Sequence, residues 1–322
     1  MKRSVKGCAL LVALLLVGCI HINLGTGGTA ELVENVIYGT HGPKILLIDI
    51  DGWISETAEP RAFGFGAPDS MASRVREQLD RAERQGDIRA IILRINSPGG
   101  TAAASDIIYG EIRHFKEEQG IPVVAQLMGV AASGGYYLAM SADTVRALPT
   151  TVTGSIGVIF SGVNFSGLME KIGIENQTLT TGPYKDAGSP LRRMTEQERA
   201  QLSSVLDGLY ARFLEVVAAG RPDLSEEEIR GLADGRIYNA VQARESGLID
   251  AIGDLPRAVE VAEEKAGIET SRVVIYHRSN QWRENLYSMS AAPAPALSPW
   301  TLLGPVSEPT FLYLWWPGVR LR

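Results

Sequence analysis

Apolar strand-like segments that alternate with helical segments are the feature of this 322-residue chain that most constrains its fold. Ile45–Ile50 and Ala90–Ile95 are rich in β-branched residues and predict buried strands, and the apolar spacing of Met71–Arg84 predicts a helix between them. A second helix over Ala102–Glu118 and a third strand over Pro122–Leu127 continue the alternation. This order predicts an α/β protein whose largely parallel sheet is covered by helices.

The longest predicted helix covers Thr195–Gly220. Thr195 and Glu198 form the pattern of a capping box at its start, and Gly220 suits a glycine cap at its end. Apolar residues recur along one face at i, i+3 and i+4 spacing. They are Leu202, Val205, Leu206, Leu209, Tyr210, Phe213, Val216 and Val217.

The amino terminus has the pattern of a secretory signal. Three basic residues in the first six positions precede the apolar run Ala9–Val17, which is too short to span a bilayer. The run ends in Leu-Val-Gly-Cys at Cys19, which resembles the lipobox of bacterial lipoproteins, in which the cysteine becomes the lipidated first residue. We therefore predict a signal peptide over 1–18 and a lipid-anchored tether or short leading strand over 19–42. An ordinary signal peptide or an uncleaved anchor is the alternative.

Charge and cysteine content exclude several classes of function. The net charge is -6, and it becomes -9 when the three basic residues of the signal peptide are removed. Because no basic stripe interleaved with aromatic residues is present, we expect no nucleic-acid partner. Both cysteines, Cys8 and Cys19, lie near the amino terminus, so the remaining chain can form neither a disulfide nor a thiolate metal site. The histidines lack metal-ligand spacing, and we expect no metal or cofactor.

Two glycine-rich turns are candidates for catalytic chemistry. Ser97-Pro98-Gly99-Gly100 and Ser133-Gly134-Gly135 each follow a predicted strand. Backbone N–H groups at the start of a helix converge on negative charge, so one turn suits an oxyanion hole. A serine followed by two glycines suits an exposed nucleophile, because small neighbours permit a sharp turn and close approach of a substrate. For either turn, a tight structural connection is the alternative.

Ser133 as a nucleophile requires a base, and no histidine is suitably placed. Lysines in glycine-rich, partly apolar segments are the candidates, and Lys185 within Thr181–Pro190 is the best of them. A free lysine has a pKa of about 10.4, so a lysine base must lie in a dry site that favours its neutral form. A solvated surface lysine in a turn is the alternative.

Four short motifs resemble, in order, those of the S49 serine peptidases, the signal peptide peptidase A family. The resemblance covers residues 43–280, which we predict to be one catalytic domain, followed by a Pro-rich, aromatic segment over 281–322. The motifs are Asn96–Gly100, Val130–Tyr137, Thr153–Val158 and Gly182–Pro190.

The resemblance implies a Clp protease/crotonase-like fold, with layered sheets and covering helices, and a Ser-Lys dyad without a cofactor. It implies that Ser133 is the nucleophile, that Lys185 is the general base and that Ser155 orients the lysine. It also implies that the turn at Gly99 and Gly100 supplies the oxyanion donor. Short members of the family form rings, so we expect a homo-oligomer whose sites are shared between subunits.

We predict a serine endopeptidase of the bacterial cell envelope, lipid-anchored through Cys19, whose periplasmic catalytic domain degrades cleaved signal peptides or other unfolded apolar peptides. A crotonase-type acyl-CoA enzyme is one alternative, although export argues against it because CoA is cytoplasmic. A non-enzymatic lipoprotein scaffold is another, although Ser133 and Lys185 argue against it. For the aromatic ending Phe311–Trp316, three roles remain open: a subunit contact, a cover for a sheet edge, or a membrane-surface contact.

Overall fold

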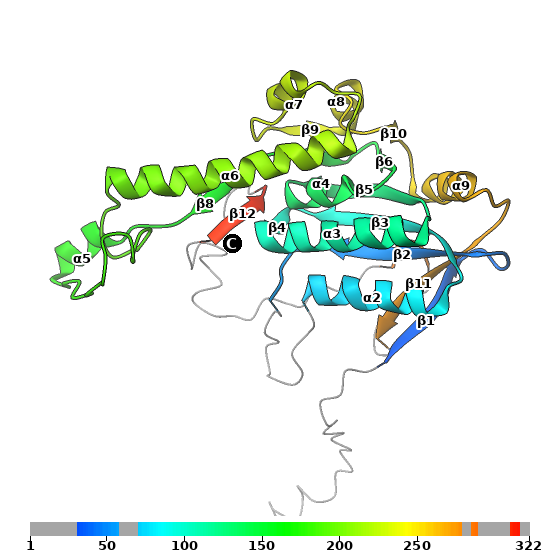
Figure 1. Cartoon of the computed structure of the whole chain (residues 1–322), viewed down its shortest axis with the longest axis horizontal. Helices are drawn as coiled ribbons and strands as arrows, with labels where there is room; N and C mark the ends of the chain where they lie inside the picture. Colours follow the sequence, from blue (N-terminus) through cyan, green and yellow to red (C-terminus); the bar gives the residue numbers. More distant parts are fainter. Residues whose placement is uncertain (1–30, 58–69, 279–284, 289–309, 316–322) are drawn as a thin grey trace, which may run out of the picture. The chain divides into compact units, whose positions relative to one another are not determined.

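The computed structural model describes residues 31–57, 70–278, 285–288 and 310–315 (Figure 1). The predicted signal peptide and Cys19 therefore lie outside the described residues, and their processing stays a prediction. Within the predicted tether, β1 (Leu32–Tyr38) is a leading strand that pairs antiparallel with β11 (Arg272–Arg278). None of the helices in these ranges is long and apolar enough to cross a bilayer.

A largely parallel sheet forms the centre of the described chain. Its strand order is β1-β11-β2-β3-β5-β6-β10, and β7 joins it by pairing with β5 and with β9. The other strands are β2 (Lys44–Asp51), β3 (Ile88–Ser97), β5 (Val123–Ala132), β6 (Thr144–Ala147), β7 (Val152–Gly154), β9 (Ile237–Asn239) and β10 (Ala251–Ile252). The long β5 pairs with β6 along its first half and with β7 at its end, which brings β7 beside the turn that follows β5.

Helices cover both faces of this sheet. Side chains alternate across β2: Leu46 and Ile48 belong to the core on the side of α2 (Met71–Gln85) and α3 (Ala102–Gln119). Ile45 and Leu47 point to the opposite face and pack in the core formed with α9 (Leu255–Ala266). Burial on both faces explains the continuous apolar strands, and it confirms the predicted layered α/β fold.

The long predicted helix is α6 (Glu196–Gly220), and the predicted capping box between Thr195 and Glu198 is present. The prediction that Gly220 is the glycine cap is wrong, because Gly220 is the last helical residue and Arg221 caps the helix. A Cβ at Gly220 would lie 2.8 to 3.1 Å from atoms of Met140, at the end of α4 (Gly134–Ala139). The glycine therefore permits close packing of α6 against α4.

A second, small sheet joins distant parts of the chain. Its order is β4-β12-β8, with β12 antiparallel to both neighbours. The strands are β4 (Gly99–Thr101), β8 (Ile159–Ser161) and β12 (Thr310–Leu314). Of the three roles open for the aromatic ending, β12 performs that of covering sheet edges, since it satisfies the backbone groups of two short strands.

Three shorter helices complete the described chain. They are α5 (Ser166–Ile172), α7 (Glu226–Leu232) and α8 (Ala240–Glu245). The carboxyl-terminal end of α6 contacts α4, whereas α5 lies near the amino-terminal end of α6, away from the central sheet (Figure 1). The segment between β8 and α6, which contains Lys185, thus projects from the sheet that holds Ser133.

Candidate active site

Ser133 occupies the turn between β5 and α4 in a strained conformation. Its φ is 53° and its ψ is -114°, a region that residues with a side chain adopt at a cost of about 1 to 3 kcal/mol. Its N–H donates to the carbonyl of Gly154 at 2.7 Å, and its carbonyl accepts from Tyr137 at 2.8 Å. The side chain is buried, and Oγ has no hydrogen-bond partner among the described residues. A buried hydroxyl left free at a strained turn is suited to react with a substrate.

Glycines allow the two predicted turns to touch. A Cβ at Gly99 would lie 2.9 Å from the nitrogen of Gly134, and one at Gly134 would lie 3.2 Å from the Cα of Gly99. A Cβ at Gly135 would lie 2.8 Å from the carbonyl oxygen of Ser97. Side chains at these positions would force the turns apart, so the glycines set how closely the turn after β3 approaches Ser133.

The amides of Gly99 and Gly100 have different roles in this structure. The N–H of Gly99 donates to Ser97 Oγ at 3.1 Å, so the protein itself satisfies it. The N–H of Trp315 donates to the carbonyl of Pro98 at 2.8 Å. In an antiparallel ladder, the residue pairs that are joined by backbone hydrogen bonds recur at every second residue. Trp315 and Pro98 form one such pair, so Tyr313 and Gly100, which lie two residues away in register, form the next. The Gly100 amide therefore faces β12.

Gly134 offers a second amide beside Ser133. It is the first residue of α4, and the first amides of a helix have no partner within that helix. Gly100 and Gly134 thus carry backbone N–H groups on the two touching turns, and the Gly100 amide is paired with β12 in this structure, so an oxyanion hole at these turns requires that β12 release that amide.

Ser155 lies beside Ser133 because β5 and β7 pair at Ala132 and Gly154. It is buried, and its N–H donates to the carbonyl of Arg236 at 2.8 Å. Among the described residues, Ser133 and Ser155 are the two non-glycine residues with positive φ, which is 50° at Ser155. No hydrogen bond joins Ser155 to Lys185 within these residues.

Lys185 is exposed, in a turn closed by a hydrogen bond from its N–H to the carbonyl of Gly182. Within the described part of the chain, its side chain makes neither a hydrogen bond nor an ion pair. One chain thus does not bring the predicted base into contact with the predicted nucleophile.

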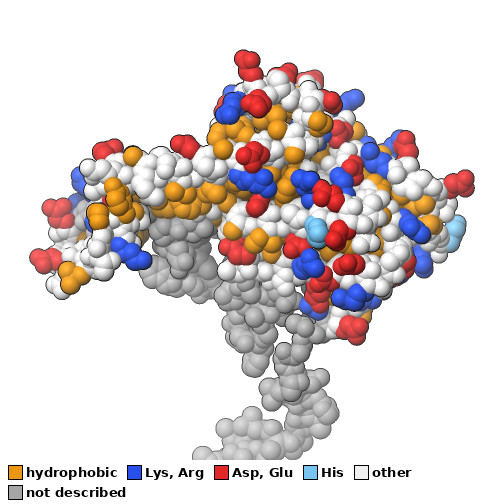
Figure 2. All heavy atoms as spheres, viewed as in Figure 1, with side chains coloured by type: hydrophobic (Ala, Val, Ile, Leu, Met, Phe, Trp, Pro, Cys, Tyr) orange, Lys and Arg blue, Asp and Glu red, His pale blue; other side chains and the backbone are white. Residues whose placement is uncertain are grey.

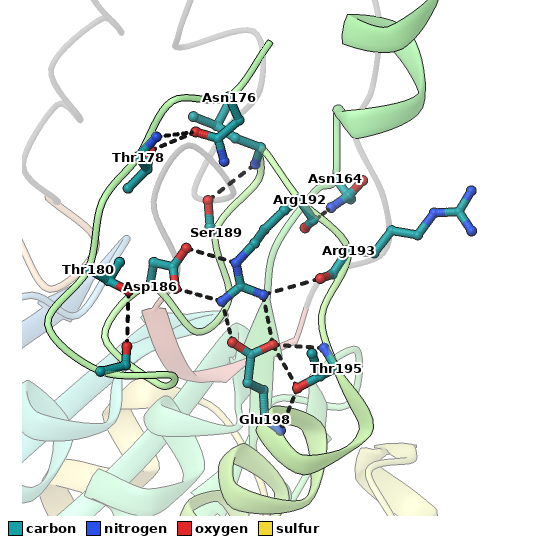
Figure 3. Close-up of polar contacts among 12 residues, drawn as sticks. Asn164, Asn176, Thr178, Thr180, Asp186, Ser189, Arg192, Arg193, Thr195 and Glu198 are labelled. Carbon is teal, nitrogen blue, oxygen red and sulfur yellow. Dashed lines mark hydrogen bonds and ion pairs between the residues drawn. The ribbon is translucent and has the colours of Figure 1, made fainter.

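An ion-pair network attaches the Lys185 segment to the start of α6 (Figure 3). Arg192 Nε donates to Asp186 Oδ2 at 2.8 Å, and its Nη1 donates to Glu198 Oε2 at 2.9 Å. The Arg192 hydrogen bonds lower the pKa of Asp186 and, with help from the Thr195 N–H, lower the pKa of Glu198 to about 2. Sequence reasoning did not single out Arg192, although its place between the Lys185 motif and the capping box was a signal.

The position of this network on α6 explains why Lys185 and Ser133 are separated. The ring of Phe213 packs on Tyr137, one helical turn after Ser133, with centroids 5.0 Å apart. Glu198 and Phe213 are fifteen residues apart in α6, which is about 22 Å along the helix. Lys185 is therefore tied to one end of α6, whereas the other end packs beside the serine.

The described residues contain no group of three or more His, Cys, Asp or Glu side chains arranged to hold a metal ion. The polar groups of the candidate site are hydroxyls and backbone amides, with an amine on the separate Lys185 segment. This set suits acyl transfer through a serine.

Comparison with known proteins identifies the family. Residues 115–269 match the model of peptidase family S49, and residues 63–156 match that of Clp protease. A protein of Enterococcus faecium named signal peptide peptidase SppA is 34% identical over 250 residues, which cover 77% of this chain and 72% of that one. The chain belongs to peptidase family S49. Ser133 and Ser155 lie in both matched ranges, and Lys185 lies in the S49 range alone.

Two other S49 relatives are much longer than this chain. Serine protease SPPA of Arabidopsis thaliana is 35% identical over 234 residues, covering 72% of this chain and 34% of the relative. Protease 4 of Haemophilus influenzae is 34% identical over 254 residues, covering 74% and 39%. This chain thus spans little more than a third of either protein. The family and these names support peptidase activity over the acyl-CoA chemistry and the inert scaffold considered from the sequence.

Proposed function

We propose that this protein is a serine endopeptidase in which Ser133 is the nucleophile and Lys185 of a neighbouring subunit is the general base. The observation that carries this proposal is the contrast between the two side chains. Ser133 Oγ is buried and has no hydrogen-bond partner, whereas Lys185 is exposed and its side chain is unpaired, both within the described residues. Among the described residues of its own chain, each of the two lacks the group that the other supplies.

The site performs hydrolysis in two acyl-transfer steps. Ser133 Oγ attacks the scissile carbonyl carbon while the neutral Lys185 amine accepts its proton. The amides of Gly100 and Gly134 donate to the oxyanion, and Lys185 returns the proton to the leaving amine as the peptide C–N bond breaks. Water then attacks the acyl-serine ester with Lys185 again as base, which releases the carboxylic acid and restores Ser133. Ser155 holds the lysine amine in position.

Apolar surface on the Lys185 segment supports contact with a second copy of the chain. Leu168, Ile172 and Leu179 are exposed in and after α5, and the first half of the α6 apolar face is only partly buried. Figure 2 shows hydrophobic side chains over α5 and along α6. A contiguous apolar surface of this kind is typical of a subunit interface. Covering it with a neighbour would also dry Lys185, which a neutral amine requires.

Mixing two inactive variants tests the shared site. Ser133→Ala and Lys185→Ala should each lose peptide hydrolysis as pure oligomers. After subunit exchange, a random equal mixture should regain about a quarter of the wild-type sites, since each such site takes its serine from one variant and its lysine from the other. Mixing Ser133→Ala with the double variant is the control and should stay inactive. A mixture that exchanges subunits without regaining activity would refute the shared dyad.

We also propose that the protein acts at the bacterial envelope on signal-peptide remnants or other unfolded apolar peptides. The predicted signal and Cys19 lipidation support this location, and the name of the Enterococcus faecium relative supports the substrate class. Two or three acyl chains on Cys19 would give a stable anchor. The mass of the amino-terminal peptide tests the anchor: an unmodified terminus, or one starting away from Cys19, would contradict it. Product masses from a panel of signal-derived peptides test the substrate.

A further inference from the structure

Arg146 of β6 is a buried arginine without a counter-charge. Only 6% of the residue is exposed, its Nε is a buried donor without an acceptor, and its side chain makes neither a hydrogen bond nor an ion pair with any described residue. Two other described arginines are as deeply buried, and each pairs with an aspartate: Arg94 with Asp49, and Arg221 with Asp250. A buried charge is strongly unfavourable unless it is paired, so the Arg146 guanidinium requires a negative group.

The sheet places this guanidinium at the start of α9. Arg146 is the register partner of Gln126 on β5, and Val124, two residues before Gln126, belongs to the core under α9. Because side chains alternate along a strand, Gln126 and Arg146 lie on the α9 side of the sheet. A Cβ at Gly253 would overlap Nη2 of Arg146, and Gly253 directly precedes Asp254, the N-cap of α9. Arg146 thus lies at the positive end of the helix dipole.

The first turn of α9 adds a buried amide. Leu255 is fully buried, and its N–H has no hydrogen-bond partner in the part of the chain that the structure describes. Pro256 has no N–H, and the N–H of Arg257 donates to Asp254 Oδ1 at 3.1 Å. Buried donors without a partner are rare in proteins, and those that occur commonly bind a water or an ion.

The charges near Arg146 do not neutralise it. Asp254 caps the first turn of α9, and Glu260 pairs with Arg257, so both carboxylates have other partners. Burial lowers the pKa of Arg146, and the positive charge of Arg257 lowers it further, against the opposite effect of the two carboxylates. A water would accept hydrogen bonds from Arg146 but would supply no charge. An anion supplies both.

We propose that Arg146 and the first turn of α9 bind a phosphate group, with the Arg146 guanidinium and the Leu255 N–H as donors. A guanidinium presents its donors in a fork that fits phosphate oxygens, and a helix N-terminus attracts phosphate through its amides and its dipole. Donors from the sheet and from the helix reach a tetrahedral group from two sides. The phosphate is either inorganic or part of a lipid headgroup. This inference does not depend on the proposed peptidase function.

Thermal unfolding of the full chain tests the site. The melting temperature is measured against the concentration of inorganic phosphate, with sodium chloride at equal ionic strength as the reference. A ligand that binds only the folded state raises the melting temperature. We expect a rise above the reference in the wild type and in Arg89→Gln, a control at an exposed arginine. Arg146→Gln should bind phosphate at least about tenfold more weakly and lose this rise. No rise in the wild type, or an equal rise in Arg146→Gln, would overturn the proposal.

A matched pair of glycine variants tests the same site without removing a charge. In Gly253→Ala, the new Cβ would displace the Arg146 guanidinium, so phosphate binding measured by calorimetry should weaken several-fold. Gly231→Ala meets no atom within 4 Å and should bind phosphate like the wild type. This pair also decides the matter if Arg146→Gln fails to fold. Equal phosphate affinity in the two glycine variants would overturn the proposal.

Glycerophosphoglycerol, a lipid headgroup without its acyl chains, separates the two sources of phosphate. Its affinity for the wild-type chain is compared with that of inorganic phosphate by calorimetry. Tighter binding of the phosphodiester would assign the site to a lipid headgroup, whereas tighter binding of inorganic phosphate would assign it to the free ion. In either case, Arg146→Gln should weaken binding by at least about tenfold. Binding of neither compound would overturn the proposal.

Discussion

The backbone N–H of Ser133 donates a hydrogen bond of 2.7 Å to the carbonyl of Gly154, the residue before Ser155. This bond joins the end of β5 to the end of β7 and sets two serines with positive φ side by side. Residues with side chains keep this conformation only where the surrounding structure enforces it, and such residues cluster at active sites. The strain at Ser133 and Ser155 therefore supports a shared catalytic role and can be tested directly.

Replacing Ser133 should separate its chemical role from its strain. Ser133→Ala and Ser133→Gly should both lose peptide hydrolysis, since both lack the nucleophilic oxygen. The glycine variant should be more stable to unfolding than the alanine variant by about 1 kcal/mol, because glycine adopts positive φ without a Cβ clash. Urea denaturation measures the difference. An alanine variant as stable as the glycine variant would show that the turn is not strained.

Ser155→Ala should reduce hydrolysis only partly. The hydroxyl is predicted to orient the lysine amine and not to exchange protons with substrate, so catalysis continues with a poorly held base. Rates from pH 6 to 9 measure the effect, with Ser204→Ala in an exposed part of α6 as the control. A full rate across this range would assign Ser155 to the turn alone.

Arg192→Ala should lower hydrolysis at least about tenfold and should also lower the melting temperature, because the buried Glu198 loses its partner. Arg192 holds Asp186, next to Lys185, to Glu198 of α6, so its loss would free the segment that carries the base. Hydrogen exchange over residues 182–190 should rise. Arg199→Ala removes an exposed ion pair of 3.9 Å on the same helix and serves as the control. If exchange over 182–190 stays at the wild-type level, the network does not hold the segment.

Acid should release the same segment. The pKa of Glu198 is lowered to about 2 and that of Asp186 is also lowered, chiefly by Arg192 hydrogen bonds. Their contribution to stability is thus complete above the unfolded-state pKa values of about 4 and is lost as the pH falls toward 2. Limited proteolysis between pH 5 and pH 2 should show progressive cleavage over 182–190. In Arg192→Ala, the dependence of this cleavage on pH should largely disappear. An unchanged dependence would show that the Arg192 hydrogen bonds are not its cause.

Substitutions at two glycines of α6 form a matched pair that tests how closely this helix packs against α4. Gly220→Ala should destabilise the protein by about 1 to 3 kcal/mol, because its Cβ would lie within 3.1 Å of Met140. Gly208→Ala meets no atom within 4 Å and should stabilise the helix by up to about 1 kcal/mol. Chemical denaturation of both variants measures the contrast. Equal effects would mean that α6 and α4 do not pack closely at Gly220.

Local pattern predicted the parts of the fold that depend on neighbours in the chain. The strand predicted over Ile45–Ile50 is β2, and the helix predicted over Met71–Arg84 is α2, each to within one residue at either end. The capping box at Thr195 was equally local. The prediction of a cap at Gly220 was wrong. Glycine occurs both at helix caps and where two helices pack closely, and only the position of Met140 shows that Gly220 serves close packing.

The sequence by itself determined which chemical groups are available: a serine and glycines at strand ends, a lysine in a glycine-rich segment, and an aromatic ending. Tertiary structure alone decided how these groups are used. Contacts between residues far apart in the chain bury Ser133, bond its N–H to the carbonyl of Gly154 and pair Tyr313 with Gly100. Such contacts depend on the path of the whole chain, because strand pairing sets register and burial together and no local pattern encodes either.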